Sequence, residues 1–273
     1  PLLDNESSDS NWSSSTSYIQ GSGGLSGTPG SINNQNSDFG DPLINEYSLE
    51  FDGSDYIRVN HDESLNLPND FTLCAWIRMT DVSSYSGLIS KRHHAVTNYS
   101  FLINQGGYLE ASNGSANGAV TSSETVHDGE WHFVVMTYNS NTNYNSFYID
   151  ATPSGGGTLS YSGPNTHPLD IGSIEAANPD RMKGKLDEAS IWNRLLSDEE
   201  ILNLMTMTQI IPSSEEGLVG YWPFDEGPEN TIGSTAYDVS NNSLHGSIFG
   251  ATYRVDTPAT VYGCTDPESP DYN

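Results

Sequence analysis

Basic residues are scarce in this 273-residue chain: nine Lys and Arg stand against 36 Asp and Glu, and the formal net charge is −27. A field of that sign repels phosphate backbones and anionic lipid headgroups. The composition therefore argues against nucleic-acid binding and against attachment to a membrane surface. The acidity itself has two readings. It keeps the protein soluble, or some of the carboxylates gather around a hard cation, which requires oxygen ligands.

Cysteines and long apolar runs are also rare. Cys74 and Cys264 are the only two cysteines, and they lie far apart in the sequence, so no disulfide framework is predicted. No apolar run reaches the roughly 20 residues that span a membrane, and no signal peptide is recognisable. We therefore expect no membrane insertion. The opening Pro1-Leu2-Leu3, without an initiator Met, is expected to be the middle of a longer chain.

Alternating apolar and polar residues dominate from Tyr47 to Asp256, with β-branched and aromatic side chains at two-residue spacing. This pattern predicts half-buried strands, joined by turns such as Asp52-Gly53 and Asn113-Gly114. We expect strands at residues 48–53, 55–59, 71–77 and 131–138. The length allows one large sandwich or two ordinary domains. The sequence predicts an all-β, antiparallel β-sandwich over residues 46–257.

One helix is expected within this region, at residues 197–205. Ser197 and Glu200 form a capping box, and Leu196 before the cap faces Ile201 as a hydrophobic staple. Two carboxylates also follow the cap, where the helix dipole favours negative charge.

Five blocks in the chain occur in an order that resembles the laminin-G-like, concanavalin A-like jelly-roll domains of bacterial extracellular proteins. They are residues 49–57 (LEFDGSDYI), 70–77 (DFTLCAWI), 128–133 (DGEWHF), 148–150 (YID) and 184–194 (GKLDEASIWNR). The resemblance implies a jelly roll that is secreted or displayed at the cell surface, where it binds glycans or promotes adhesion. It also implies a structural calcium ion. Two departures are Cys74, where a small polar residue is usual, and Asp150-Ala151, where Asp-Gly is usual.

A further block at residues 216–227 (EGLVGYWPFDEG) also resembles this family, in which it often opens the domain. Here it follows the predicted helix. It either closes the same sandwich or begins a second copy. Closure is favoured, because an orphan segment would expose Trp222 and Phe224.

The two flanks have a different composition. Residues 1–45 contain no Lys or Arg, are rich in Ser, Asn and Gly, and resemble the end of a lamin-tail domain. Residues 258–273 resemble a linker followed by the start of a repeat that carries Cys264, Thr265, Asp266 and Pro267. Cys264 is therefore expected to stay unpaired with Cys74, which lies in a predicted core strand. Other modules of the same parent chain are the expected neighbours.

The resemblance places the metal site near Asp52 and Asp187, with Asp238, Asn241 and Asn242 as further ligands. Calcium takes six to eight oxygens, so carboxylates must be joined by amide or backbone carbonyl oxygens. The alternative is that each Asp caps its own turn, which is a common role for Asp in loops.

Candidate ligand contacts lie in the segment from Asp81 to Tyr99, which is expected to be a loop. It mixes aromatic, cationic and imidazole groups at Tyr85, Arg92, His93, His94 and Tyr99. A solvated loop without a ligand is the simpler reading. A transition metal at His93-His94 is discounted, because adjacent strand residues point to opposite faces and no further ligand is spaced nearby.

Tryptophans suit sugar stacking, but Trp76, Trp131, Trp192 and Trp222 sit among alternating apolar residues, so we expect them to fill the space between two sheets.

A hydrolase would need two carboxylates about 5 Å apart, as in the Glu-x-Asp-x-x-Glu strand of retaining glycosidases with this fold. Residues 46–52 do not fit that spacing, and neither a nucleophile elbow nor a phosphate loop is found. The sequence therefore predicts a non-catalytic binding or adhesion module that binds glycan and is stabilised by calcium. A purely structural spacer and a concanavalin-fold glycoside hydrolase remain the alternatives.

Overall fold

A computed structural model describes residues 45–258, except residues 95, 176–179, 208–209 and 213–214. The predicted modules at 1–45 and 258–273 therefore lie almost wholly outside the described residues, as does Cys264. The domain boundaries at 46 and 257 stay a prediction. In the described part, no helix is long and apolar enough to cross a membrane.

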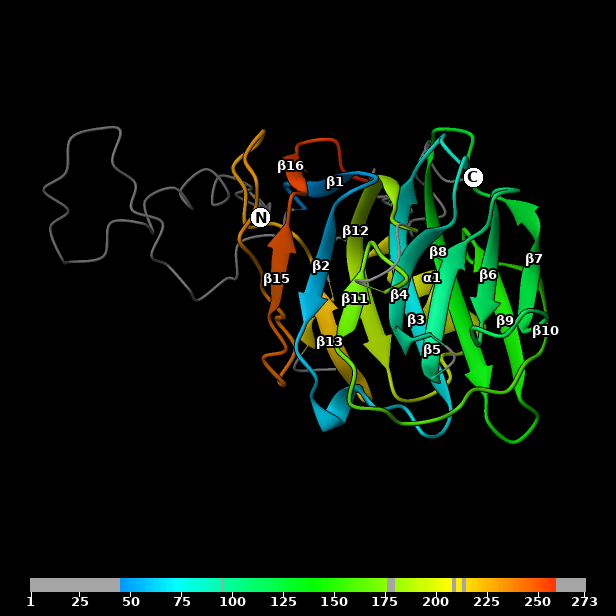
Figure 1. The fold of residues 1–273 in the computed structure, drawn as a ribbon. Helices are drawn as coiled ribbons and strands as arrows, with labels where there is room; N and C mark the ends of the chain where they lie inside the picture. The colour runs from blue at the N-terminus through cyan, green and yellow to red at the C-terminus, as the bar shows by residue number, and fades with distance from the viewer. Residues whose placement is uncertain (1–44, 95, 176–179, 208–209, 213–214, 259–273) are drawn as a thin grey trace, which may run out of the picture. The chain divides into compact units, whose positions relative to one another are not determined.

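Two antiparallel sheets form the sandwich, as expected (Figure 1). Sheet A runs in the order β10-β9-β8-β3-β12-β1-β16, and β13 pairs with the far part of β12. Its strands are Thr152–Thr158, Tyr144–Ile149, Trp131–Asn139, Phe71–Arg78, Lys183–Trp192, Ser48–Asp52, Thr252–Arg254 and, for β13, Leu218–Trp222.

Sheet B runs in the order β14-β15-β2-β11-β4-β5-β6-β7 and meets sheet A at its edge, where β7 pairs with β10. Its strands are Thr235–Ala236, Gly246–Phe249, Tyr56–Val59, Leu169–Ile171, Ser86–His93, Val96–Ile103, Tyr108–Ser112 and Ala119–Thr125. A short 3₁₀ turn, Glu63–Leu65, follows β2.

The block at 216–227 and the residues after it belong to this sandwich. β13 pairs with β12, β15 pairs with β2, and β16 pairs with β1. Trp222 and Phe224 are fully buried in the main core. The described structure thus has this segment closing both sheets.

Two apolar clusters result from the alternation. Residues such as Leu73, Ala75 and Ile77 of β3 fill the space between the sheets. Their neighbours Cys74 and Trp76 point to the outer face of sheet A, where a second cluster forms. Burial raises the pKa of the Cys74 thiol to about 12, which keeps it protonated and unreactive.

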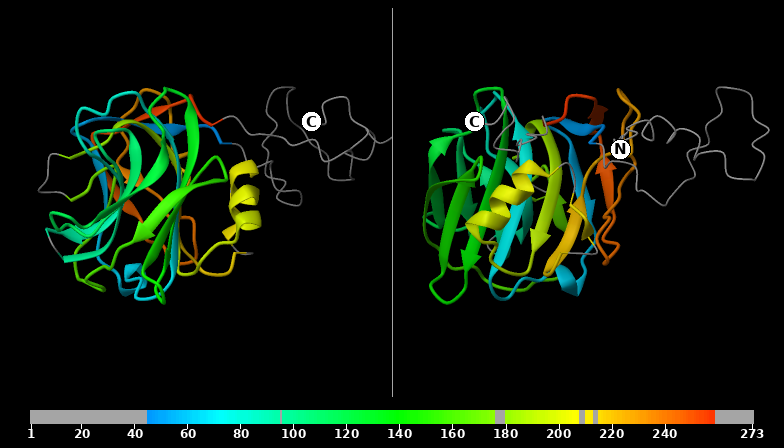
Figure 2. Two further views of the ribbon diagram at one scale, coloured as in Figure 1. Left: turned by 90° about the vertical axis from the view of Figure 1, so that its right-hand side faces the viewer. Right: turned by 180° about the vertical axis from the view of Figure 1, so that it is seen from behind.

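Helix α1, Asp198–Thr206, covers this second cluster (Figure 2). The predicted capping box is present: the Ser197 hydroxyl accepts from the Glu200 amide at 3.3 Å, and the Glu200 carboxylate accepts from the Ser197 amide at 2.7 Å. Ile201 and Leu204 are the buried face of the helix.

The position of three tryptophans corrects the sequence-based expectation. Trp222 lies in the core between the sheets, but Trp76 and Trp192 are buried outside sheet A, under the helix. Trp131 is half-buried at the same face, and its indole N–H donates to Asp256 at 3.1 Å. The alternation on β3, β8 and β12 puts these side chains on the outer face, and only a covering helix makes that face suitable for them.

Candidate functional site

The five predicted metal ligands do not form one site. Asp52 ends β1 opposite Lys183, whereas Asp187 lies four positions further along β12, opposite Trp76. Asp52 is exposed and its carboxylate accepts from the amide (2.8 Å) and hydroxyl (2.6 Å) of Ser54. The alternative reading, an Asp that caps its own turn, therefore describes Asp52.

Asp238 stabilises the turn at residues 238–244 rather than facing Asp187 or Asp52. Its carboxylate accepts from the amides of Tyr221, Ser240 and Leu244 at 2.7 to 2.9 Å, and from the Ser240 hydroxyl. The Asn242 amide nitrogen donates to the Val219 carbonyl at 2.8 Å, and Asn241 is exposed. The Asp238 oxygens thus already serve as hydrogen-bond acceptors within this turn.

Asp187 instead belongs to a buried acidic cluster with Asn45, Glu188 and Asp225. Asp187 is fully buried; its carboxylate accepts from the Asn45 side-chain amide at 3.0 Å and from the Glu188 backbone amide at 2.9 Å. A register shift in β12 between Asp187 and Ser190, with Glu188 at a φ of 52°, puts two consecutive acidic side chains on the same side of the sheet. A regular strand would have separated them.

Among the described residues, no Lys, Arg or His side chain contacts the carboxyl groups of Asp187 or Glu188. Burial, followed by the charge of Glu188, raises the pKa of Asp187 well above its usual value, and burial raises that of Glu188 in the same way. The charge of Asp225 raises both pKa values further. Asp225 itself accepts from the backbone amides of Glu46 and Tyr47 at 2.7 and 2.9 Å. The raised pKa values favour the protonated, uncharged form of Asp187 and Glu188.

Two oxygens in the cluster are buried without a hydrogen-bond partner: Oδ1 of Asn45 and Oε1 of Glu188. The other Glu188 oxygen accepts from the Tyr221 hydroxyl. Such orphaned acceptors are rare in folded proteins and need an explanation. Amide and carboxylate oxygens are the ligands that calcium prefers. In the described part of the chain, no three His, Cys, Asp or Glu side chains converge tightly enough to hold a metal alone, so amide and backbone oxygens would have to contribute.

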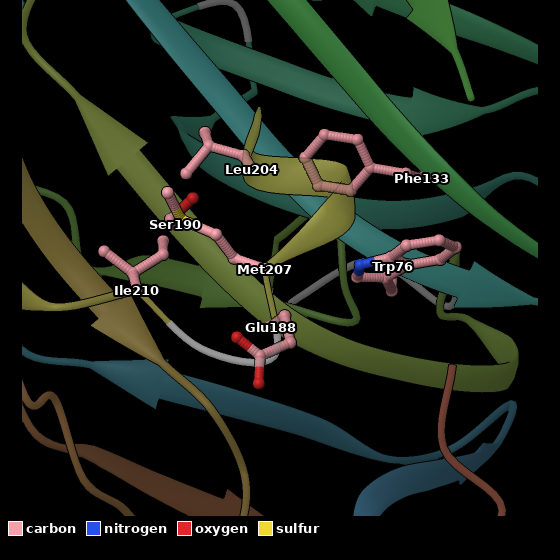
Figure 3. A pocket seen from close by; sticks show the side chains of 7 residues that line it. All are labelled: Trp76, Phe133, Glu188, Ser190, Leu204, Met207 and Ile210. Carbon is pink, nitrogen blue, oxygen red and sulfur yellow. The ribbon is translucent and has the colours of Figure 1, made fainter. Parts of the chain in front are cut away.

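A small cavity borders Glu188 under the helix (Figure 3). Its volume is about 10 Å³, and it is lined by Trp76, Phe133, Glu188, Ser190, Leu204, Met207 and Ile210. That is room for about one water molecule. A water there can donate a hydrogen bond to Glu188, but it leaves the charge of two buried carboxylates uncompensated. The cavity is too small to bind an organic ligand.

The segment predicted as a ligand-binding loop is largely a β-hairpin, formed by β4 and β5. The prediction that Tyr99 contacts a ligand is wrong. Tyr99 is fully buried, because β5 points this side chain into the core, and its hydroxyl donates to the Leu65 carbonyl at 3.1 Å. Tyr85 is 36% exposed, but it precedes β4 and lies at the opposite end of that strand from His93.

Arg92, His93 and His94 do come together at the other end of the hairpin. His94 takes a left-handed turn conformation (φ 52°), so its ring lies 4.1 Å from that of His93, and strand alternation does not separate them. Glu175 accepts from the His94 amide at 2.5 Å and lies 3.9 Å from the Arg92 guanidinium. Burial lowers the pKa of Arg92. This is a partly buried polar cluster.

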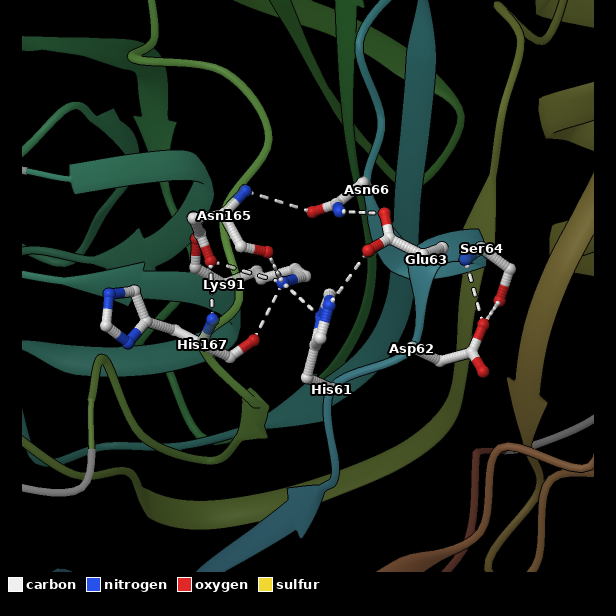
Figure 4. A network of polar contacts seen from close by, with 8 residues as sticks. All are labelled: His61, Asp62, Glu63, Ser64, Asn66, Lys91, Asn165 and His167. Carbon is white, nitrogen blue, oxygen red and sulfur yellow. Dashed lines mark hydrogen bonds and ion pairs between the residues drawn. The ribbon is translucent and has the colours of Figure 1, made fainter.

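Lys91, next to these residues, is fully buried and is held by neutral groups (Figure 4). Its ammonium donates to the carbonyls of Asn165 and His167 at 2.8 and 2.7 Å and to the Asn165 side chain at 3.1 Å. His61 lies 3.3 Å away, and the ring of His61 lies 3.4 Å from Glu63. Burial lowers the pKa of Lys91 to about 8. The lysine thereby ties residues 165–167 to β4, which is a structural role.

An open groove of about 810 Å³ lies where β1, β3, β12 and β16 end. It holds four of the nine basic side chains of the chain, each paired with a carboxylate. Lys183 contacts Asp81 at 2.7 Å and Arg254 contacts Glu50 at 2.6 Å. Arg78 contacts Asp256 at 2.8 Å, and Lys185 contacts the same carboxylate. Asp52, one of the predicted site residues, also lines this groove.

The groove carboxylates are held ionised, in contrast to the buried cluster. The hydrogen bond from Lys183 lowers the pKa of Asp81, and that from the Ser54 hydroxyl lowers the pKa of Asp52. Burial opposes the same effect at Asp256, but Lys185 and Trp131 still lower its pKa. Asp55 is the exception: burial raises its pKa, and it is 8% exposed.

Comparison with known proteins identifies the family of this chain. The sequence model of the concanavalin A-like lectin/glucanases superfamily matches residues 51–202. The chain belongs to this superfamily. Among curated proteins, the chain is similar to Sushi, von Willebrand factor type A, EGF and pentraxin domain-containing protein 1 of Mus musculus (26% identical over 166 residues) and of Rattus norvegicus (27% identical over 169 residues). Those matches cover 57% and 58% of this chain but 5% of each relative, so the chain spans about a twentieth of their length.

Solved structures were also compared with this chain. A candidate carbohydrate-binding protein from Bacteroides ovatus ATCC 8483 is similar with a TM-score of 0.63 at 22% identity, over 78% of this chain and 61% of that one. A heptameric SAP-like pentraxin from Limulus polyphemus gives a TM-score of 0.44 at 16% identity, over 59% of this chain and 82% of that one. The first likeness confirms the sandwich fold predicted from the sequence.

Sequence reasoning within this superfamily found Asp187 and missed its partners. Glu188 follows Asp187 directly, and only the bulge in β12 places it on the same side. Asn45 and Asp225 are remote in sequence and become neighbours through the pairing of β1 and β13 with β12. The one available signal was the pair of consecutive acids in an otherwise apolar strand, where charged residues are rare.

Proposed function

We propose that this chain is a non-catalytic, extracellular carbohydrate-binding module of the superfamily, braced by calcium, that works within a larger secreted or surface protein. The name of the Bacteroides ovatus protein suggests the class of ligand. The observation in this chain that carries the proposal is the open groove with its fixed array of paired charges.

The groove suits a sugar because hydroxyls both donate and accept hydrogen bonds. Carboxylates at Glu50, Asp81 and Asp256 offer acceptors, and their partners Arg254, Lys183 and Arg78 offer donors. Each pair is already formed, so a ligand pays little conformational entropy to meet it. The site is shallow and open, and such sites bind in the micromolar to millimolar range, about 4 to 8 kcal/mol. Useful adhesion then requires several copies.

The proposal of a non-catalytic role rests on the pKa values of the carboxyl groups in the groove. A glycosidase needs an acid with a raised pKa next to an ionised carboxylate, both presented to the substrate. The pKa values of Asp52, Asp81 and Asp256 are lowered. Asp55 has a raised pKa but is buried, with one oxygen accepting from the Asp52 amide at 2.9 Å. Hydrolysis remains the second candidate, carried by Asp55 alone. Release of reducing sugar from laminarin, agarose or xylan that is lost in Asp55→Asn would overturn the non-catalytic reading.

Calcium is proposed at the buried acidic cluster. Asn45, Asp187, Glu188 and Asp225 would hold it, and the two orphaned oxygens of Asn45 and Glu188 support this assignment. When bound, the ion would supply the positive charge that the cluster lacks. The residues themselves tie the first described residues of the chain to β12 and to the segment after β13. The ion would thereby brace the sandwich rather than contact the sugar in the groove.

Binding is tested with a glycan array followed by calorimetry on the strongest ligand. Asp81→Ala and Lys183→Ala remove one exposed pair in the groove, and each should weaken binding about tenfold without changing the melting temperature. Glu199→Ala is the matched control, because it also removes one exposed carboxylate but lies on α1, outside the groove. No binding to any glycan would favour a purely structural spacer.

A further inference from the structure

Two aromatic rings stack on the surface of sheet B. Tyr56 of β2 and Phe249 of β15 are paired across adjacent strands, with ring centroids 4.6 Å apart and planes 11° from parallel. Phe249 is 46% exposed. Figure 1 shows β2 and β15 side by side along one border of the sheet. Single exposed apolar side chains are ordinary, and Ile232 and Tyr237 are more exposed than Phe249. The Tyr56–Phe249 pair differs from them because its two rings are stacked into one flat aromatic surface.

The stacked pair is held rigid by two guanidinium groups. The Arg181 guanidinium carbon lies 4.6 Å from the centroid of the Tyr56 ring, and that of Arg58 lies 5.3 Å from it. Arg58 is fixed by a bidentate pair with Asp170, at 2.8 and 3.0 Å. Arg181 donates to the carbonyl of Ser54. The rings are therefore set in place before any ligand arrives, which lowers the entropic cost of binding.

The pair stands at the rim of the groove. Asp55 and Gly250, the chain neighbours of Tyr56 and Phe249, line the groove directly. Gly250 has a φ of 92°, and a Cβ there would lie 1.9 Å from the Asp55 carboxylate, so the two turns pack tightly against each other. A ligand that lies in the groove and continues past Asp55 would therefore meet the ring of Phe249.

We propose that Tyr56 and Phe249 form a stacking subsite for one ring of a neutral oligosaccharide whose other rings lie in the groove. The inference rests on the proposed carbohydrate-binding function. The C–H face of a pyranose packs on the exposed Phe249 ring, while Arg58 and Arg181 hold the Tyr56 ring beneath it in place. Aromatic stacking supplies affinity, while the polar groups fix orientation.

A neutral ligand follows from the charge. The groove walls carry five carboxylates against four cations, and the chain as a whole has a net charge of −27. A polyanionic chain would be repelled on approach. The ligand must also contain more than one ring, since one ring cannot occupy both the groove and its rim.

The test compares neutral laminari-, xylo- and galacto-oligosaccharides of two to six rings by calorimetry. Phe249→Ala should weaken binding of the longer oligosaccharides about fivefold to tenfold, consistent with about 1 kcal/mol for an aromatic contact. The loss should be smaller for disaccharides, which fit within the groove. Phe249→Trp should keep affinity within about twofold. Tyr144→Ala is the control, because Tyr144 is 43% exposed on β9 and does not line the groove.

The outcomes separate the two proposals. Binding that is weakened by Lys183→Ala at every chain length, and by Phe249→Ala more for the longer oligosaccharides than for disaccharides, supports both. Binding that depends on Lys183 but is unchanged in Phe249→Ala at every chain length overturns the stacking subsite and keeps the groove. Equal losses in Phe249→Ala and Tyr144→Ala also overturn it. The absence of binding by any neutral oligosaccharide overturns the proposed function, and the subsite with it.

Discussion

The buried acidic cluster and the groove use the same residue types in opposite ways. Asp187 and Glu188 lie out of water with no basic partner among the residues that the structure describes, and burial raises their pKa values. Asp81 and Asp256 lie at the surface next to lysine or arginine, and their pKa values are lowered. Desolvation decides in the first region, and hydrogen-bonded cations decide in the second. The contrast teaches that in a strongly acidic protein the surroundings of each carboxylate, rather than the number of carboxylates, decide its pKa, and it directed the proposed calcium ion to the buried pair.

The largest effect is expected at Asp187, where the substitution Asp187→Asn separates calcium binding from packing. Without calcium, the amide replaces a carboxyl group whose burial already disfavours the ionised form, so the melting temperature should stay the same or rise. With calcium at a hundredfold excess over its dissociation constant, the parent gains about 2.7 kcal/mol and the variant should not. Thermal unfolding with calcium and with EDTA measures both. A parent melting curve that is identical in the two conditions, with no metal found by elemental analysis, would contradict the proposal of a calcium site.

The rise in melting temperature on adding calcium should also depend on pH. A carboxyl whose folded-state pKa is raised binds more protons when folded, so without calcium its contribution to stability is present below the unfolded pKa of about 4 and is lost as the pH rises. Calcium must displace those protons. The difference in melting temperature with and without calcium should therefore grow from pH 4.5 to pH 7.5. A difference that is constant across this range contradicts the assignment to Asp187 and Glu188.

A smaller effect is expected in the groove from Asp256→Asn. Asp256 joins Arg78, Lys185 and the indole of Trp131, and the side chain is 34% exposed. Its loss should cost about 1 kcal/mol of unfolding free energy, because partly exposed charge pairs contribute little individually. Urea unfolding at low and at high salt measures this, and the cost should shrink as salt screens the pairs. A calcium-dependent cost would instead connect the groove to the acidic cluster.

The smallest effect is expected from Asp81→Asn, because the side chain of its partner Lys183 is 58% exposed and water screens the ion pair. The melting temperature should not change measurably, while the affinity for glycan falls. A clear loss of stability here would show that the groove is structural and would remove the contrast with the acidic cluster.

Much of the fold follows from local patterns in the sequence. The strand at 71–78 could be predicted because apolar residues alternate in it, and the helix because Ser197 and Glu200 form a capping box. Alternation also led to errors. It placed Trp76 and Trp192 between the sheets, because one strand does not reveal which of its two apolar faces a distant helix covers.

The sites were less predictable for a related reason. Alternation separates His93 from His94 and Asp187 from Glu188, yet both pairs lie together, at a left-handed turn and at a bulge respectively. Such local departures depend on tertiary packing. The groove and the Tyr56–Phe249 pair need strands far apart in the sequence to meet, so no single segment indicates them.

The pairing of β1 with β16 has a mechanical consequence. Ser48, near the start of the described chain, lies opposite Arg254, near its end, and the Ser48 hydroxyl donates to the Asp256 carbonyl at 2.7 Å. In an antiparallel pair the hydrogen bonds run perpendicular to the strands. Tension applied through residues 45 and 258 would therefore load these bonds one pair at a time, beginning where the start of β1 lies beside the end of β16. The two strands should therefore separate one hydrogen bond after another at low force. Near residue 45, the contacts of Asn45 with Asp187 and of Glu46 with Asp225 would have to break first.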